Sequence, residues 1–242
     1  MSEAGSTTAT TTTMLAASKV NQFYGGSHTL WDIDLDVPAG GCVCLMGRNG
    51  VGKTTLLKVI MGLLPAVSGK IRFRDADLPA GRPDARARAG IGFVPQGREI
   101  FPSLTVEENL MVGRRALGKS DLPEKVLTLF PVLKTMLRRR GGDLSGGQQQ
   151  QLAMGRALAL DPKLLILDEP VAGMTHAEME RTSELLRGLA GKHTIVVVEH
   201  DMEFVRSIAR RVTVLHEGKV LADGPMAQIQ ADPRVVEVYL GE

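Results

Sequence analysis

Apolar and polar residues alternate near the start of the chain, and short apolar runs follow. Across residues 31–37 every second residue is apolar and the residues between them are acidic, until Pro38 ends the pattern. This alternation predicts an antiparallel strand with one face in water. Cys42–Met46 is apolar throughout and predicts a fully buried strand, and residues 69–73 predict another strand.

The middle of the chain has helical spacing instead. Residues 103–160 are mostly helical in pattern. Thr105 and Glu108 have the spacing of a capping box, which predicts that a helix begins there. Two further helices are expected over residues 124–130 and 148–160.

Strands and helices alternate again in the last third. The predicted strands of the core are residues 91–94, 164–167, 194–198 and 212–215. The predicted helices are residues 177–189 and 203–210, with a short amphipathic helix near Tyr239. Such alternation indicates an α/β fold with a mostly parallel sheet covered on both faces. Residues 97–160 are then a helical lobe inserted into that core, beside an antiparallel β lobe at the start.

The bulk properties are those of a globular protein. The 242 residues suffice for one large domain with an inserted lobe. A formal net charge of +2 argues against a protein that coats nucleic acid. Basic clusters at residues 82–88 and 138–140 are interpreted as solvated surface. No stretch approaches the roughly 18 apolar residues that a membrane helix needs.

The two cysteines and the first residues bear on where the protein works. Cys42 and Cys44 would share one face of a strand, a poor geometry for a disulfide, which favours buried thiols in a reducing compartment. Residues 1–13 are rich in Ser, Thr and Ala and lack the apolar core of a secretory signal. We expect a flexible tail there, or a start codon placed early with Met14 as the natural start, and a cytosolic protein.

The strongest local signal is a glycine-rich turn between the buried strand and a predicted helix over residues 56–64. The turn satisfies the pattern G-x-x-x-x-G-K-[ST] with Gly47, Arg48, Asn49, Gly50, Val51, Gly52, Lys53 and Thr54. Backbone N–H groups of such a turn wrap a phosphate, and the helix start adds positive charge. We expect Lys53 to neutralise the β- and γ-phosphates, Thr54 to offer its hydroxyl to Mg²⁺ and Thr55 to bind the adjoining phosphate. The alternative, a glycine-rich turn with a chance lysine, fits this strand–helix context poorly.

Two more predicted strands end in polar groups that would meet this loop. Asp168 and Glu169 follow one strand and His200 follows another, and such strand ends lie at the ligand-binding edge of a parallel sheet. Asp168 would hold Mg²⁺, and Glu169 would polarise the attacking water as a general base. His200 would contact the γ-phosphate or position Glu169 and water. Without the phosphate loop, the two acids would be interpreted as a surface turn. The remaining histidines are interpreted as surface or packing residues: His28, His176, His193 and His216.

A second turn of the same kind begins the helix over residues 148–160. It consists of Ser145, Gly146, Gly147 and Gln148. The serine can cap the helix, and the two glycines leave backbone N–H groups bare. The turn is either a second anion-binding helix start or a cap with a flexible turn.

In this order along the chain, these motifs resemble the ABC ATPase family from about residue 15 to the end. The resemblance implies a P-loop NTPase fold, with a mostly parallel core, an antiparallel β lobe and an inserted helical lobe. It implies that Tyr24 stacks on adenine and that Gln96 senses Mg²⁺ and water. It further implies that Ser145, Gly146, Gly147 and Gln148 bind the γ-phosphate of an ATP held by a second subunit, with two chains packed head to tail.

One position departs from the family pattern. Family members commonly carry a Leu-Asp step after the Glu-Pro of the second motif, whereas this chain has Met174 and Thr175. That aspartate couples the two nucleotide sites in the family, so cross-talk is expected to be altered here. Hydrolysis is expected to persist because Glu169 and His200 are present.

Two sets of motifs resemble different ATPase subunits of urea and branched-chain amino acid uptake systems. The first set resembles one urea-transporter subunit: residues 21–28, 47–53, 96–102 and 139–144. The second set resembles its partner subunit: residues 168–175, 198–202 and 235–240. The crossover would fall near residues 155–167, which leaves both a homodimer and a heterodimer open.

The resemblance implies a Mg²⁺-dependent ATPase that powers uptake of urea or a related small solute. Branched-chain amino acid or amide import is the alternative, and a soluble non-transport ABC ATPase a more distant one. The implied partners are a second ATPase subunit, two membrane permease subunits and, indirectly, an extracytoplasmic solute-binding protein, with no nucleic acid. The implied location is the cytoplasmic face of the inner membrane. Phe101, Leu104 and Met111 would either contact the permeases or belong to the core of the helical lobe.

Overall fold

The computed structural model describes residues 12–240 of the chain. The tail predicted over residues 1–13 lies outside this range except for its last two residues, and Thr13 already begins the first strand. The strands are β1 (Thr13–Tyr24), β2 (Ser27–Pro38), β3 (Cys42–Met46), β4 (Ser68–Phe73), β5 (Ala76–Asp77), β6 (Ile91–Val94), β7 (Leu164–Asp168), β8 (Thr194–Val198), β9 (Arg211–His216) and β10 (Lys219–Gly224). The helices are α1 (Lys53–Ile60), α2 (Pro83–Ala89), α3 (Val106–Ala116), α4 (Glu124–Leu129), α5 (Pro131–Thr135), α6 (Gly146–Leu158), α7 (His176–Leu189), α8 (Met202–Ile208), α9 (Met226–Ala231) and α10 (Pro233–Leu240), with a 3₁₀ turn at Gly141–Asp143.

A six-stranded sheet forms the centre of the fold, in the order β10-β9-β3-β8-β7-β6. The strands from β9 to β6 are parallel, and β10 pairs antiparallel with β9 at the edge. Because β3, β8 and β7 are neighbours, the turns that follow them meet at one edge of the sheet. The predicted α/β fold with a mostly parallel sheet is confirmed.

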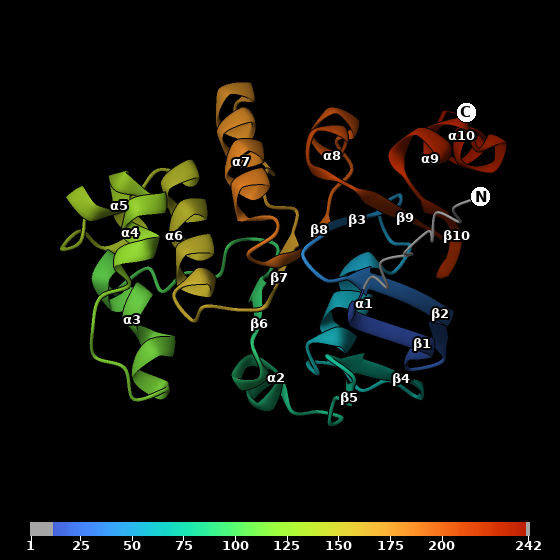
Figure 1. Cartoon of the computed structure of the whole chain (residues 1–242), viewed down its shortest axis with the longest axis horizontal. Coiled ribbons are helices and arrows are strands. Elements are labelled where there is room, and N and C mark those ends of the chain that lie inside the picture. Colours follow the sequence, from blue (N-terminus) through green and yellow to red (C-terminus); the bar gives the residue numbers. More distant parts are fainter. Residues whose placement is uncertain (1–11, 241–242) are drawn as a thin grey trace, which may run out of the picture.

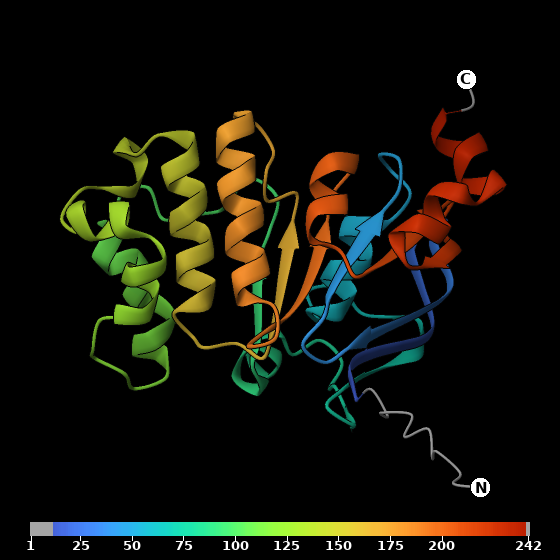
Figure 2. The ribbon, with the colours of Figure 1, turned by 45° about the horizontal axis from the view of Figure 1, so that its top comes forward.

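Two smaller units flank this sheet, on either side of it in Figure 1. A four-stranded antiparallel sheet, in the order β2-β1-β4-β5, packs with α1 against one face. Helices α3 to α6 form the helical lobe, and α6 lies beside α7 in both views (Figures 1 and 2). Helices α9 and α10 lie at the opposite end of the molecule from the helical lobe.

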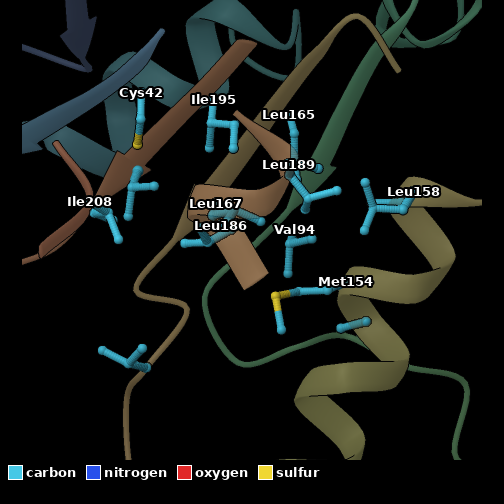
Figure 3. Packing of buried hydrophobic residues seen from close by; sticks show 14 of the residues in the cluster. Cys42, Val94, Met154, Leu158, Leu165, Leu167, Leu186, Leu189, Ile195 and Ile208 are labelled. Carbon is cyan, nitrogen blue, oxygen red and sulfur yellow. The ribbon is translucent and has the colours of Figure 1, made fainter. Parts of the chain in front are cut away.

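Both faces of the six-stranded sheet are covered by apolar cores. On β3, Cys42 and Cys44 belong to the core that α6, α7 and α8 complete, whereas Val43 and Leu45 belong to the core around α1 and the antiparallel sheet. Figure 3 shows the first of these cores, where side chains of the sheet meet those of α6. A strand buried on both faces needs apolar residues at every position, which explains the uninterrupted apolar run of β3. The two cysteines are buried and free, as predicted.

The alternation in β2 breaks at one residue. Ile33 is buried as the pattern predicts, but Trp31 is 43% exposed. Asp32 has a φ of 44°, and the register of β2 with β1 shifts between Leu30 and Ile33. This bulge turns Leu30, and not Trp31, into the core.

The end of α1 and the arginine that packs against it both differ from the prediction. Helical spacing predicted apolar contacts through residue 64, but α1 ends at Ile60 and Leu63 is 50% exposed. Arg86, from the basic cluster interpreted as solvated surface, is instead buried. Its guanidinium donates hydrogen bonds to the carbonyls of Val59 (2.6 Å) and Ile60, so it satisfies the last carbonyls of α1.

Several short elements were not predicted from the sequence patterns. They are β5, β10, α2, α5 and α9. The other predicted elements are present, and most of their ends agree within two residues. The exceptions are α1, which begins three and ends four residues before the predicted helix, and β2, which begins four residues before the predicted strand. The short elements join or cover the edges of the two sheets, where tertiary contacts and not periodicity decide the local structure.

Candidate functional site

The turn between β3 and α1 has the geometry of a phosphate-binding loop. Gly52 precedes α1 with a φ of 103°, and a Cβ on it would lie 2.7 Å from the side chain of Leu30. A Cβ on Gly47 would lie 2.6 Å from the carbonyl oxygen of Leu215. Both positions therefore require glycine. The first turn of α1 carries no acidic residue, so no side chain of that turn offsets the positive end of the helix.

Lys53 is buried at the start of α1, and its ammonium group lies inside the loop. The ammonium donates hydrogen bonds to the carbonyl oxygens of Gly47 (2.7 Å) and Arg48 (3.0 Å). Burial lowers the pKa of Lys53, while the nearby carboxylates of Glu169 and Asp168 oppose that shift. A cation held by neutral carbonyls inside an anion-binding turn has the position that the predicted role requires.

Asp168 at the end of β7 is the side chain whose surroundings best fit a bound cation. It is 1% exposed, and neither carboxylate oxygen has a hydrogen-bond partner within the described residues. Burial raises the pKa of Asp168, and the nearby Thr54 hydroxyl lowers it without completing a hydrogen bond to either oxygen. An orphaned buried carboxylate next to a threonine hydroxyl fits a hard divalent cation such as Mg²⁺.

Glu169 and Gln96, predicted from distant parts of the sequence, are in direct contact. The Gln96 amide Nε2 donates a hydrogen bond of 2.7 Å to Oε2 of Glu169. Glu169 has a φ of 50°, a left-handed conformation that is uncommon for a residue with a side chain and is concentrated at functional sites. The Glu169 amide donates to the Val198 carbonyl, which ties this bend to β8 (3.0 Å). The structure thus fixes a half-buried carboxylate at the edge where a phosphate would be held.

His200 follows β8 and is exposed at the same edge of the sheet. Its neighbour Glu199 is 1% exposed and was not among the predicted site residues. Glu199 accepts hydrogen bonds from the amides of Val171 (3.1 Å) and His200 (3.2 Å). An acid directly after a buried apolar strand was the sequence signal that could have identified it.

The Ser145 turn is one of three capping boxes that the described residues form. Thr105 begins α3, Ser145 begins α6 and Thr175 begins α7, each paired with the residue three positions later. Both threonine hydroxyls donate their proton to a glutamate, at 2.9 Å in each case. Ser145 accepts from the Gln148 amide (3.3 Å), but its hydroxyl donates no hydrogen bond to any described residue. The predicted cap is confirmed, and its hydroxyl proton remains available to a phosphate oxygen.

The remaining predicted contacts are divided between surface and interior. Tyr24 ends β1 at a hairpin turn and is 47% exposed. Phe101 is 43% exposed and lines an open groove of about 650 Å³, whereas Met111 is 2% exposed in the core of the helical lobe. The guanidinium of Arg156 lies over the Phe101 ring at 5.1 Å from its centre. Of the three residues predicted either to contact the permeases or to belong to the lobe core, Phe101 lines the groove, Met111 lies in the core and Leu104 is half-buried outside the groove lining.

The described residues, 12–240, contain neither a preformed metal-binding cluster nor a helix that could span a membrane. No three or more His, Cys, Asp or Glu side chains there are grouped so that they could hold a metal ion. Asp168 and Thr54 would consequently need phosphate oxygens to complete a Mg²⁺ site. None of the helices in that range has both the length and the apolar composition to cross a membrane.

Comparison with family models agrees with this geometry. The model described as ABC transporter matches residues 30–172, from β2 to the turn after β7. A second model, described as branched-chain amino acid ATP-binding cassette transporter, matches residues 219–242.

Individual proteins of known name or structure match nearly the whole chain. The high-affinity branched-chain amino acid transport ATP-binding protein BraG of Pseudomonas aeruginosa is 39% identical, over 94% of this chain and 100% of its own length. The crystal structure of the ADP conformation of MJ1267, an ATP-binding cassette of an ABC transporter, superposes with a TM-score of 0.82 at 28% identity, over 95% of this chain and 99% of that one. The dimeric structure of MJ0796, a bacterial ABC transporter cassette, has a TM-score of 0.80 at 26% identity, over 88% of this chain and 99% of that one.

Proposed function

Because this chain belongs to the ABC transporter family of ATP-binding subunits, we propose that it hydrolyses MgATP to drive import of branched-chain amino acids or a related small solute. BraG and the family match at residues 219–242 support this substrate class. The sequence motifs pointed first to urea, which neither comparison supports. Urea is therefore the second candidate.

The single observation that carries the ATPase proposal is the orphaned carboxylate of Asp168 beside the phosphate loop. Two unpaired anionic oxygens at 1% exposure are costly unless a cation arrives with the ligand. Asp168, Thr54 and Gln96 would hold Mg²⁺, which neutralises phosphate charge when bound. Lys53 would exchange its two loop carbonyls for the β- and γ-phosphates, since an ion pair with phosphate is stronger than a bond to a neutral carbonyl.

Within this site, Glu169 would accept a proton from the attacking water. The hydrogen bond from Gln96 holds the carboxylate in place and leaves its other oxygen to face that water. His200, exposed at the adjoining strand end, would donate a hydrogen bond to the γ-phosphate. Tyr24 would stack on adenine, and the amides of residues 47–52 would surround the phosphates, with Thr55 on the adjoining phosphate.

A second chain would complete the site. The Ser145 hydroxyl proton is the only one of the three capping hydroxyl protons, among the described residues, that is not donated to a carboxylate. Together with the amides of Gly146 and Gly147 and the side chain of Gln148, it would bind the γ-phosphate of an ATP held by the facing chain. We therefore place two ATPase subunits head to tail, as a homodimer or with a related subunit.

The membrane permeases would bind the groove between α3, α6 and residues 99–101. Phe101 and Val112 are exposed there at 43% and 39%, an apolar surface that a short cytoplasmic helix of each permease subunit would cover. The protein would then work at the cytoplasmic face of the membrane, with an extracytoplasmic solute-binding protein acting only through the permeases.

Transport by the reconstituted complex tests the substrate. The ATPase and the permeases that copurify with it are placed in liposomes with their solute-binding protein, and uptake of labelled leucine and labelled urea is measured. We expect ATP-dependent leucine uptake that exceeds urea uptake, and none with Glu169→Gln. Uptake of urea alone would overturn the substrate class, and absence of MgATP hydrolysis would overturn the ATPase.

A further inference from the structure

Glu199 is a buried acid at the ligand-binding edge of the six-stranded sheet, and the proposed reaction assigns it no role. It follows β8, the strand between β3 and β7, and is 1% exposed. Within the described residues the only basic side chain within 4.0 Å of its carboxylate is the His200 ring, with Nδ1 at 3.7 Å. A buried carboxylate without a strong ion pair costs stability, so its retention calls for a reason.

The two oxygens of Glu199 hold two different segments. Oε1 accepts from the amide of Val171, which lies two residues after Glu169 (3.1 Å). Oε2 accepts from the amide of His200 (3.2 Å). Among side chains of this length, only a carboxylate offers acceptors on both terminal atoms, because glutamine replaces one oxygen with an NH₂ donor. Burial raises the pKa of Glu199, and the two amides oppose that shift.

These segments bear the two groups that would act on the γ-phosphate and its attacking water. His200 ends one segment, and Glu169 begins the other, which continues to Thr175 at the start of α7. A second link runs parallel to the first, since the Glu169 amide donates to the Val198 carbonyl (3.0 Å). The ends of β7 and β8 are thereby joined on both sides of Pro170.

We propose that Glu199 is a positioning residue that holds the His200 segment and the segment from Glu169 to Thr175 as one unit. This inference rests on the proposed ATPase function. When His200 moves to contact the γ-phosphate, Glu169 would therefore move with it. The same link reaches Thr175, the position where the family commonly carries its coupling aspartate.

The variant Glu199→Gln tests the link, since it keeps the size of the side chain and loses one of the two acceptors. We expect kcat for MgATP to fall about tenfold with KM nearly unchanged, because a hydrogen bond to a charged group is lost while the phosphate loop stays intact. In the His200→Ala background the same substitution should cause a smaller loss, because the part of its effect that passes through His200 is already gone while the part that passes through Glu169 remains.

Thr194→Val is the matched control at the other end of β8. Thr194 is also 1% exposed, and its hydroxyl accepts a hydrogen bond from the Gly40 amide (2.9 Å). The variant Thr194→Val should lower Tm and leave kcat unchanged. If Glu199→Gln behaves like Thr194→Val, or lowers kcat equally with and without His200, the inference is overturned.

Amide hydrogen exchange of the wild-type protein provides a test that needs no variant to fold. The Val171 and His200 amides should both be protected, and MgATP should change their protection together. Free exchange at either amide would overturn the inference. Wild-type protein that does not hydrolyse MgATP would instead contradict the proposed function, so the two failures are distinguishable.

Discussion

The edge of the six-stranded sheet and the start of α6 are built in opposite ways. At the sheet edge, the buried Lys53 and Glu199 are held by backbone carbonyls and amides, and the buried Asp168 has no hydrogen-bond partner among the described residues. At the start of α6, Ser145 and Gly146 are exposed, and the turn is held by its own capping box. The first region has the features of an interior that receives a ligand, and the second those of a surface that closes over one.

Glu169→Gln should have the largest effect, because it changes the chemistry of the sheet edge and leaves the start of α6 unaltered. The sheet edge keeps its shape and its capacity to bind ATP, but the water loses its base. We expect kcat to fall by about 100- to 10,000-fold. Turnover assays and ATP-binding calorimetry on the same preparation measure both quantities. Full turnover by this variant would remove the assigned role of Glu169.

Lys53→Ala should weaken ATP binding itself. The phosphates lose a charge-assisted hydrogen-bond donor, which predicts a rise in Kd of about 10- to 100-fold. The half-buried Lys58 in the last turn of α1 offers a control, since Lys58→Ala removes the same charge from the far part of the helix. Equal Kd values for the two variants would contradict the placement of the phosphates.

Asp168→Asn should stabilise the protein without ligand and abolish its response to Mg²⁺. Burial raises the pKa of Asp168 above its ordinary value of 3.8, so the folded state holds this proton more tightly than the unfolded state. The contribution of Asp168 to wild-type stability should therefore be lost as pH rises above 3.8 through the raised pKa of the folded state, and the variant lacks this contribution. At neutral pH the variant should gain roughly 1–3 kcal/mol in free energy of unfolding. Thermal melts across pH would contradict this if the variant melted lower at pH 7.

Ser145→Ala and Thr105→Ala form a matched pair of caps with different expected consequences. Each should lose about 1 kcal/mol of stability, because both remove an N-cap oxygen. Only Ser145→Ala should also lower ATP turnover, by about 3- to 10-fold, since its hydroxyl proton would bind phosphate. Comparable turnover in the two variants would identify Ser145 as a cap alone.

How far the sequence predicted the structure also differs between regions. The phosphate loop, β3, β6 and β8 follow from local pattern, because strands buried on both faces and glycine turns are specified by adjacent residues. The contact of Gln96 with Glu169 joins residues far apart in the chain, and only family resemblance anticipated a shared role. The predicted positions of Arg86 and Trp31 were wrong. Arg86 is buried because the end of α1 needs a hydrogen-bond donor, and Trp31 is exposed because of a bulge in β2, and both are tertiary features. Glu199 was overlooked because its two partners lie on different segments.

The molar mass of the Glu169→Gln protein in solution tests most directly whether one chain closes the site of another. It would be measured by light scattering with and without MgATP, alone and with any ATPase subunit that copurifies. We predict a mass near 26.0 kDa without nucleotide and a dimer with MgATP, which adding Ser145→Arg prevents while ATP still binds. Bound ATP without a dimer, or a dimer that survives Ser145→Arg, would contradict the account.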